Sequence, residues 1–263
     1  MRFCRIELGG RPAWGSVEDG TVRVLSGSPL DDVPAATGAE IPLADAVLLP
    51  PVIPGVFYAV GLNYRSHVEH ALARGYRVAA LPERPEVAYR ANNALTGHGS
   101  PIIRPHGVKG RFEAEGEVVA VIGATLRNAT YEEARAGIFG WTIGNDVSAR
   151  AWQHEDRSFW RSKNSDTFKP MGPWIETEVD PLAQTTTMRV NGEIEAVFPT
   201  GAMIFDPYEF IVETTRYITM RPGDVLWMGA DGTCQLEPGD TVEIEITGIG
   251  TLSNPVHAER TRR

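Results

Sequence analysis

The chain has 263 residues, 42% of them hydrophobic and 22% charged, with a formal net charge of −9. This composition is typical of a globular protein large enough to bury a full core, and an acidic chain offers no basic surface for nucleic acid. The sequence contains no apolar run long enough to cross a bilayer and no apolar signal region at its start, so we expect a soluble cytoplasmic protein without membrane or nucleic-acid partners.

Residues 1–50 predict a small N-terminal unit of β-strands. Short alternating runs, RFCRIEL and TVRVL, are separated by Gly-Gly and Asp-Gly turns. The proline-rich stretch LLPPVIPGV, residues 48–56, then predicts an extended connector and a boundary. The two cysteines, Cys4 and Cys234, are too isolated to indicate a disulfide framework or a zinc site, and we expect reduced thiols.

The remainder of the chain predicts few helices and many strands. TTTMRVNGEIEAVF indicates a hairpin that turns at Asn191-Gly192, and RPGDVLWMG and EPGDTVEIEITGIG each place a Pro-Gly-Asp turn before a strand. Because strands and helices do not alternate regularly, the pattern favours a mixed α+β, β-rich fold over a doubly wound one. Three helices are predicted, over residues 64–74 with a cap at Asn63 and a stop at Gly75, over 131–139 with a capping box at Thr130 and Glu133, and from Pro207 with a cap at Asp206.

The stretch RFEAEGEVVAVIG, residues 111–123, places three glutamates at alternate positions before an apolar run. Alternate residues of a strand share a face, so Glu115 and Glu117 point the same way near the core. Two unpaired carboxylates there would repel each other, whereas a divalent metal would hold them together, because hard cations prefer oxygen ligands. The alternative is a solvated strand face, which is common.

Two further segments carry polar side chains whose roles the residues alone leave open. In WTIGNDVSAR, Asp146 ends an apolar strand and is either a third metal ligand or a helix cap. In RSKNSDTFKPMGPW, Lys163, Asp166 and Lys169 lie in a polar loop. A lysine near a metal can stabilise an enolate or a carboxylate, but a lysine in a loop is more often solvated.

Two histidines, His67 and His70, lie three positions apart on the first predicted helix and so share a face. Near a metal site, such a histidine is a candidate general base that activates water. Zinc binding is a second interpretation, although no third soft ligand follows at zinc spacing. A pair of solvated histidines is the third interpretation.

Over residues 55–258 the chain closely resembles the fumarylacetoacetate hydrolase family, in its acylpyruvase and 2-hydroxyhepta-2,4-diene-1,7-dioate isomerase-like branch. Each shared segment is weak alone, but the ordered set is specific. The resemblance implies a β-roll of twisted mixed sheets, with residues 1–50 as a separate small unit, and a homodimer. The segments that carry it are, in order, GLNYRSH, EAEGEVVAVIG, GNDVSAR, KNSDTFKPMGPW, VNGE, MIF, RPGDVLWMG and GIGTLSNPV.

The resemblance also implies a set of site residues. The metal would be Mg²⁺ or Mn²⁺, with Ca²⁺ as a substitute in crystals, and Lys163 falls on the family's metal-site lysine. Arg90 falls where members often carry a substrate-facing lysine, and Glu113 has no family role, so we expect it to be exposed. The implied metal ligands are Glu115, Glu117 and Asp146, the catalytic residues His67, Glu69, His70 and Lys163, and the substrate-binding residues Arg90, Arg150, Asp166 and Ala230.

The implied activity is hydrolytic cleavage of a carbon–carbon bond in an acylpyruvate or other 1,3-dicarbonyl or 2-oxo acid, through an enolate held at the metal. Two departures favour a shifted substrate or a non-hydrolytic reaction. Hydrolytic members often carry N-Y-x-x-H-x-x-E, but His70 occupies the glutamate position here, and Glu69 points about 100° away on the helix. Ala230 stands where many members carry a threonine whose hydroxyl meets a substrate carboxylate.

Other reactions at the same site are therefore the alternative: decarboxylation, tautomerisation or isomerisation, or dehydration of a 2-oxo acid. A metal-stabilised module without catalysis is a further hypothesis, and it would need neither Lys163 nor His67. A zinc hydrolase is the weakest, because the implied ligands are all oxygen.

Overall fold

The structure is a computed structural model that describes residues 1–73 and 81–260. Its fold is mixed α+β and rich in strands, as predicted. The strands form three sheets, and helices are few and short within the described ranges. The α-helices are α1 (Arg65–Ala73), α2 (Tyr131–Ala136), α3 (Arg150–Glu155) and α4 (Pro207–Thr215), and the 3-10 helices are η1 (Leu43–Asp45), η2 (Asn92–Ala94), η3 (Pro181–Ala183) and η4 (Thr200–Ala202).

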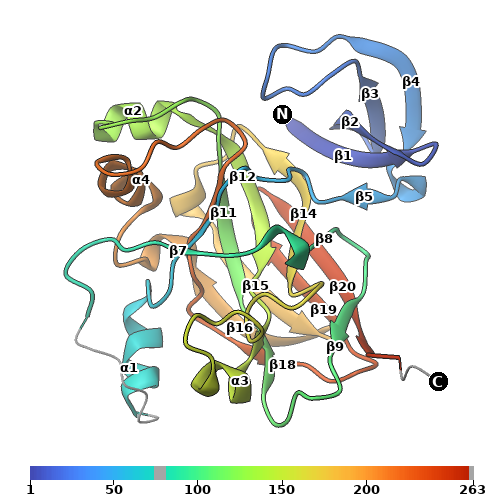
Figure 1. Cartoon of the computed structure of the whole chain (residues 1–263). Helices are drawn as coiled ribbons and strands as arrows, with labels where there is room; N and C mark the ends of the chain where they lie inside the picture. Colours follow the sequence, from blue (N-terminus) through green and yellow to red (C-terminus); the bar gives the residue numbers. More distant parts are fainter. Residues whose placement is uncertain (74–80, 261–263) are drawn as a thin grey trace.

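The largest sheet has twelve strands and is the central element of the fold (Figure 1). Two short strands pair beside its main path, β5 (Leu48–Leu49) with β1 and β8 (Leu95–Thr96) with β14. The main path follows, in hydrogen-bonded order, β4 (Ala36–Pro42), β3 (Thr21–Leu25), β2 (Arg11–Glu18), β1 (Arg2–Leu8), β14 (Lys169–Glu176), β12 (Ile138–Asn145), β11 (Gly116–Ile122), β17 (Val225–Trp227), β6 (Phe57–Ala59) and β7 (Ala88–Tyr89).

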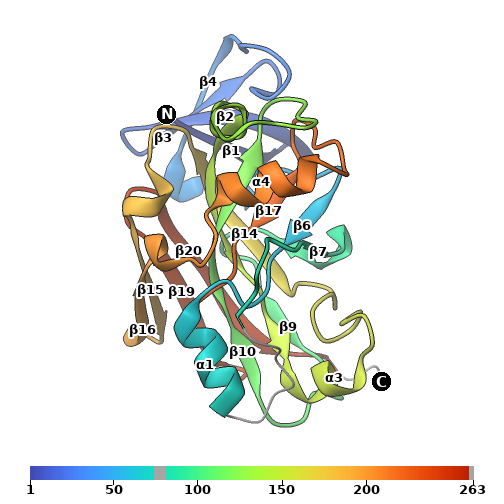
Figure 2. The same ribbon diagram turned by 90° about the vertical axis from the view of Figure 1, so that its left-hand side faces the viewer.

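Two smaller sheets complete the fold. Five strands pair in the order β16 (Glu193–Pro199), β15 (Thr185–Val190), β19 (Thr241–Ile246), β20 (Gly250–Ala258) and β9 (Ile102–Arg104). Three short strands pair in the order β13 (Ser148–Ala149), β10 (Phe112–Ala114) and β18 (Cys234–Gln235). Figures 1 and 2 both place α1, α3 and β10 at the end of the molecule opposite β1–β4, whereas α2 and α4 pack together elsewhere.

The N-terminal strands are hydrogen-bonded to the central sheet. Strand β1 runs antiparallel to β14, with Arg2 opposite Glu176. The terminal amine of Met1 donates to Glu176 at 3.0 Å, and Arg2 Nε donates to the same carboxylate at 3.1 Å. Backbone pairing and ion pairs thus attach residues 1–50 to the rest of the chain. The division into two units stays a prediction.

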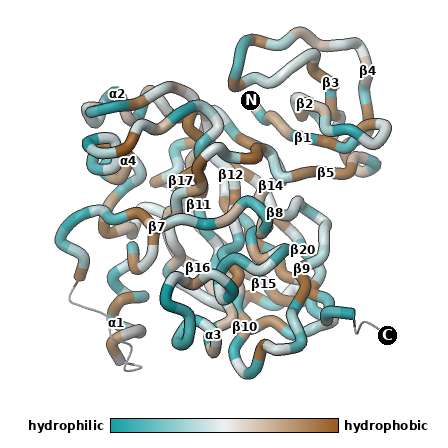
Figure 3. The backbone as a smooth tube through the Cα atoms, in the orientation of Figure 1, coloured by the Kyte–Doolittle hydropathy of each residue, from teal (hydrophilic) through white to brown (hydrophobic). Residues whose placement is uncertain are grey.

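The interior strand β11 is buried on both faces, which explains its continuous apolar run. Val118 and Ile122 pack in the largest core cluster, with residues of the five-stranded sheet such as Ile244. Val119 and Val121 face a second cluster on the opposite side. The period of two in a strand assigns neighbours to opposite faces, so a strand between two cores needs apolar residues at every position. Figure 3 shows the hydrophobic stretches along β11 and β17.

The predicted local signals agree with the observed elements. Thr130 and Asp206 each form a capping box, at α2 and α4 respectively. Asn191 and Gly192 both have positive φ, 54° and 85°, as a tight hairpin turn requires. Helix α2 ends three residues earlier than predicted because β12 begins at Ile138. The predicted stop of the first helix at Gly75 lies outside the described residues.

Two findings in the described part of the chain bear on the expectations from composition. None of its helices combines the length and the apolar character that a membrane span requires. Cys4 and Cys234 are both free and buried. Burial raises the pKa of each thiol to about 12, so both stay protonated at neutral pH.

We predict that Gly140→Ala destabilises the fold. A Cβ at Gly140, in β12, would lie 2.7 Å from the backbone oxygen of Glu176 and 2.7 Å from Ile175 Cγ2. Overpacking of this kind costs about 1–3 kcal/mol. The matched control is Gly27→Ala, because no atom lies within 4 Å of a Cβ there. Urea unfolding of both variants measures the effect, and equal free energies of unfolding would contradict the prediction.

Candidate active site

Three buried carboxylates meet where two neighbouring strands of the central sheet end. Glu117 lies in β11, Glu115 precedes that strand, and Asp146 follows β12. The antiparallel register pairs Gly116 with Asn145, so these acidic residues face each other across the pair. One ligand oxygen from each of the three lies within 4.8 Å of the others. The antiparallel register of the two strands therefore brings together the three acids that form the acidic triad, Glu115, Glu117 and Asp146.

The chain bends at Glu115, between β10 and β11. The Asn145 side chain accepts a hydrogen bond from the Glu115 backbone N–H at 3.1 Å, and the Asp146 N–H donates to the Glu115 carbonyl at 2.9 Å. The three glutamates are thus not on one continuous strand, as the sequence suggested, although all three line one cavity. The helix-cap interpretation of Asp146 is wrong, because α3 begins at Arg150 and its N-cap is Ala149.

Three cations surround Asp146. Arg90 Nη2 and Lys163 Nζ each lie 2.9 Å from Asp146 Oδ2, and Lys169 Nζ lies 2.6 Å from Oδ1. Burial alone would raise the pKa of Asp146, but these cations hold it well below its usual range. Lys163 also contacts Glu115. The interpretation of the two lysines as solvated loop residues is therefore wrong.

Lys169 is a site residue that the sequence analysis mentioned without assigning a role. Its side chain is fully buried at the start of β14, and burial lowers its pKa to about 7. The chain has 25 basic residues, of which only Lys109, Lys163 and Lys169 are lysines. Two of these three lie at the acidic triad, and this rarity is a signal in the sequence that could have identified Lys169.

Glu113 is buried, so the expectation that it is exposed is wrong. Arg150 Nε donates to Glu113 at 2.6 Å, and Arg111 also contacts that carboxylate. Arg150 Nη2 donates to Glu115. A single guanidinium thus bridges two acids, which is the planar fork geometry that arginine provides. Glu113 neutralises Arg150 and helps to fix its direction.

The acids of the triad have pKa values shifted in opposite directions. Burial would raise the pKa of Glu115, but the charges of Arg150 and Lys163 hold it below its ordinary value. Burial, together with repulsion from Asp146 and Glu115, raises the pKa of Glu117 to about 8. The Glu117 carboxylate accepts a hydrogen bond from the Gly229 N–H at 2.8 Å. Glu117 is the triad member whose negative charge the protein balances least.

The triad opens into a cavity of about 580 Å³. Arg90, Arg150 and Lys163 line it, together with His67 from α1 and Ala230 after β17. Burial lowers the pKa of His67, with the charges of Glu115 and Asp231 acting in the opposite direction. The structure therefore brings most of the predicted site residues into one space. Ser66 and Asp231, which the sequence analysis did not identify, join them through a hydrogen bond from the serine hydroxyl.

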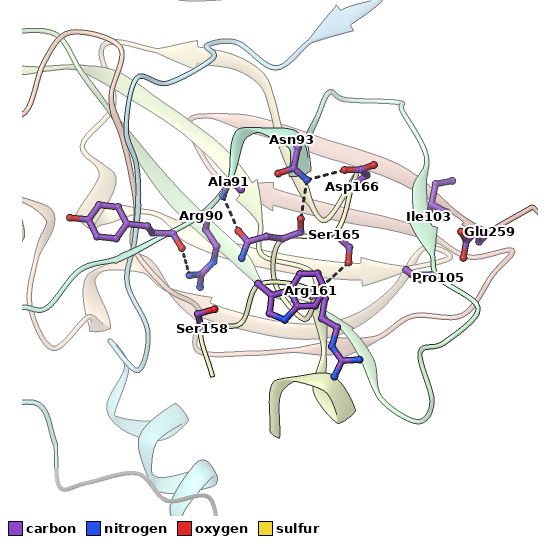
Figure 4. A pocket seen from close by; sticks show the side chains of 13 residues that line it. Arg90, Ala91, Asn93, Ile103, Pro105, Ser158, Arg161, Ser165, Asp166 and Glu259 are labelled. Carbon is purple, nitrogen blue, oxygen red and sulfur yellow. Dashed lines mark hydrogen bonds between the residues drawn. The ribbon is translucent and has the colours of Figure 1, made fainter. Parts of the chain in front are cut away.

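Three predicted site residues lie elsewhere or are not described. Glu69 is exposed on α1 and is not among the described residues that line the cavity. The side chain of His70 lies outside the described part of the chain. Asp166 lies in a second cavity of about 840 Å³, where it accepts a hydrogen bond from Asn93 at 2.8 Å (Figure 4). Arg90 lines both cavities, and the acidic triad belongs to the first.

The triad fits a divalent cation. Two oxygens bound to one ion lie at most about 4 Å apart for Mg²⁺ and about 5 Å apart for Ca²⁺. The carboxylate oxygens of the triad lie within 4.8 Å of one another, which is close to the spacing that one divalent ion requires. A cation would also remove the repulsion that raises the pKa of Glu117. An all-oxygen ligand set suits Mg²⁺, Mn²⁺ or Ca²⁺ better than Zn²⁺.

We predict that metal binding at this site depends on pH. Below pH 8, Glu117 carries a proton that the metal must displace, so the affinity for Mg²⁺ falls as the pH falls, and binding at pH 7 releases close to one proton. Titration calorimetry at pH 6.5, 7.5 and 8.5, in two buffers of different ionisation enthalpy, measures both quantities. Affinity that is constant over this range, without proton release, would contradict the prediction.

Comparison with known proteins assigns the family. Residues 56–257 match the model described as fumarylacetoacetate (FAA) hydrolase C-terminal, and residues 1–51 match the model described as Rv2993c-like, N-terminal. The chain is 36% identical to Protein Rv2993c of Mycobacterium tuberculosis, over 97% of this chain and 98% of that protein. It is 32% identical to the 2,4-didehydro-3-deoxy-L-rhamnonate hydrolase of a Sphingomonas species, over 97% and 96% of the two chains.

A solved structure supports the same assignment. The crystal structure of 2-hydroxyhepta-2,4-diene-1,7-dioate isomerase from Mycobacterium marinum matches with a TM-score of 0.87 and 35% identity, over 99% of this chain and all of that one. The strand-rich fold agrees with this match. Because the first model covers most of the chain, the protein belongs to the fumarylacetoacetate hydrolase family.

Proposed function

We propose that this chain is a divalent-metal-dependent hydrolase that cleaves a carbon–carbon bond in an acylpyruvate or another 1,3-dicarbonyl or 2-oxo acid. The observation that carries the proposal is the buried acidic triad, with Lys163 beside it and His67 in the same cavity. Membership of a family with hydrolase and isomerase relatives supports it. The residues that would hold the metal are Glu115, Glu117 and Asp146.

The cations of the protein would bind and stabilise the substrate. A bound Mg²⁺ or Mn²⁺ ion would supply Lewis-acid polarisation of a keto oxygen. Lys163 and Arg90 line the cavity, and each lies 2.9 Å from Asp146, so the fold holds both charges in place before the substrate arrives. Positive charge that is fixed in advance in a dry site stabilises a developing enolate more than the same charge in water. Arg90 adds a planar fork suited to a carboxylate.

His67 is the proposed base. Burial lowers its pKa, so the ring is neutral at pH 7 and can take a proton from water. The water oxygen then bonds to the remote carbonyl carbon, the carbon–carbon bond breaks, and its electron pair forms the enolate. Return of the proton from His67 to the enolate carbon gives the 2-oxo acid, and the other product is a carboxylic acid.

Tautomerisation or isomerisation, decarboxylation, or dehydration of a 2-oxo acid at the same site is the second candidate. Positions three and four after His67 are His70 and Ala71, so the helix supplies no acid to assist that histidine in activating water. In a tautomerisation no water attacks, and His67 would move a proton from one substrate atom to another. Binding of a small-molecule oxo acid, the preference for Mg²⁺, the homodimer and the cytoplasmic location stay predictions.

We predict that Lys163→Met lowers kcat by about 10²–10³-fold and leaves Mg²⁺ binding intact. The substitution removes the fixed charge that stabilises the enolate, and it removes no metal ligand. The assay follows loss of enol absorbance for a panel of acylpyruvates, with Mg²⁺ and after chelation, and calorimetry follows the metal. The matched control is Lys109→Met, since Lys109 is exposed and is not among the described residues that line the cavity.

Other outcomes separate the alternatives. Turnover that survives chelation would contradict the metal-dependent reaction. A parent protein that binds Mg²⁺ and leaves every acylpyruvate intact, but tautomerises or decarboxylates 2-oxo acids, would support the second candidate. If both the parent and Lys163→Met bind Mg²⁺ and neither turns over any oxo acid, the metal would serve the fold alone.

A further inference from the structure

One carboxylate that lines the cavity outside the acidic triad, Asp231, contacts the residue before the proposed base. Asp231 lies in the segment MGADGT after β17 and lines the cavity together with His67. The hydroxyl of Ser66, the residue before His67, donates a hydrogen bond to Asp231 Oδ1. This bond joins the first turn of α1 to a segment 165 positions away in the sequence.

We propose that Asp231 is the positioning carboxylate of His67. The inference rests on the proposed function, in which His67 accepts and returns a proton. A histidine that acts as a base becomes a cation, and an orienting acid both stabilises that cation and fixes the ring. Helix α1 itself offers His70 and Ala71 at the positions that share a face with His67, and Glu69 is exposed. The acid therefore has to come from another element.

Residues 228–231 tie α1 to the metal site. The side-chain amide of Asn63, just before the helix, donates to the carbonyl of Met228 at 3.1 Å. The N–H of Gly229 donates to Glu117 at 2.8 Å, and Asp231 binds Ser66. Three of these four residues thus contact the entry of the helix, a triad member and the residue before the base. That arrangement fixes the place of His67 relative to the triad.

The charges around His67 also single out Asp231. Arg150 and Lys163 oppose a positive charge on the ring, whereas Glu115 and Asp231 favour it. Glu115 is already engaged by both of those cations and by the Ser148 hydroxyl at 3.0 Å. Glu115 acts more strongly on His67 than Asp231 does, but among the described residues Asp231 contacts the Ser66 hydroxyl and no cation, so it is the acid left to balance the charge that His67 gains during proton transfer.

The test separates the effect of the Asp231 charge from the effect of its hydrogen bond to Ser66, in the full-length Mg²⁺-loaded protein. Asp231→Asn keeps an acceptor for Ser66 and removes the charge; Ser66→Ala removes the bond and keeps the charge; Ser66→Thr keeps both.

We expect Asp231→Asn to lower kcat on the order of 10–100-fold with little change in KM, and to move the acid limb of the kcat/KM profile to lower pH. Ser66→Thr should restore the parent rate that Ser66→Ala loses. Glu132→Gln, at an exposed position of α2 that does not line the cavity, is the control and should change neither quantity.

A second readout needs no turnover. NMR titration of the His67 ring, with its signal assigned through His67→Gln, measures its pKa in the Mg²⁺-loaded protein without substrate. A fall in the His67 pKa in Asp231→Asn, and none in Glu132→Gln, would support the inference even if no oxo acid is turned over, in which case the proposed reaction alone fails. An unchanged His67 pKa in Asp231→Asn would overturn the inference whatever the activity of the parent.

Discussion

The charge of Asp146 is the constraint on which the rest of the site depends. A carboxylate that is removed from water is costly unless cations and hydrogen bonds replace its hydration. Asp146 meets this demand with three cations from separate segments: Arg90 after β7, Lys163 in the turn before β14, and Lys169 at the start of β14. The loss of one partner from a buried ion pair costs about 3–5 kcal/mol because the other charge is left uncompensated, so the buried charge of Asp146 depends on these segments being in place.

The same network leaves room for a metal because its charge is unevenly distributed. The cations hold the pKa values of Glu115 and Asp146 low, whereas the pKa of Glu117 rises to about 8. A protonated Glu117 is one way to relieve the repulsion within the triad, and a divalent ion is another. A fourth side-chain cation beside Glu117 would stabilise the metal-free protein but compete with the ion. The protein instead gives Glu117 a single backbone donor, from Gly229, which leaves its other oxygen for a ligand.

Sequence patterns predicted the features that depend on neighbours in the chain. The capping boxes at Thr130 and Asp206, the Asn191-Gly192 turn and the buried run after Glu117 follow from local rules of backbone geometry. The acids of the triad were identified through the family resemblance, because the residues alone left a solvated strand face open for Glu115 and Glu117 and a helix cap open for Asp146. What the sequence could not supply is the partner of each charge. Lys169 and Glu113 were misjudged for this reason, since the former is neutralised by Asp146 and the latter by Arg150, contacts that only the folded chain creates.

The source of the acid beside His67 decides how the base and the metal site are coupled. An acid three positions along α1 would move with the helix, so the histidine would keep its partner wherever the helix went. Here the acid, Asp231, belongs to the segment that also binds Glu117 through Gly229. The contact that joins Asp231 to α1 and the contact that holds Glu117 therefore lie three residues or fewer apart on the same segment. A distant acid makes proton transfer conditional on an assembled site, which a local acid would not do.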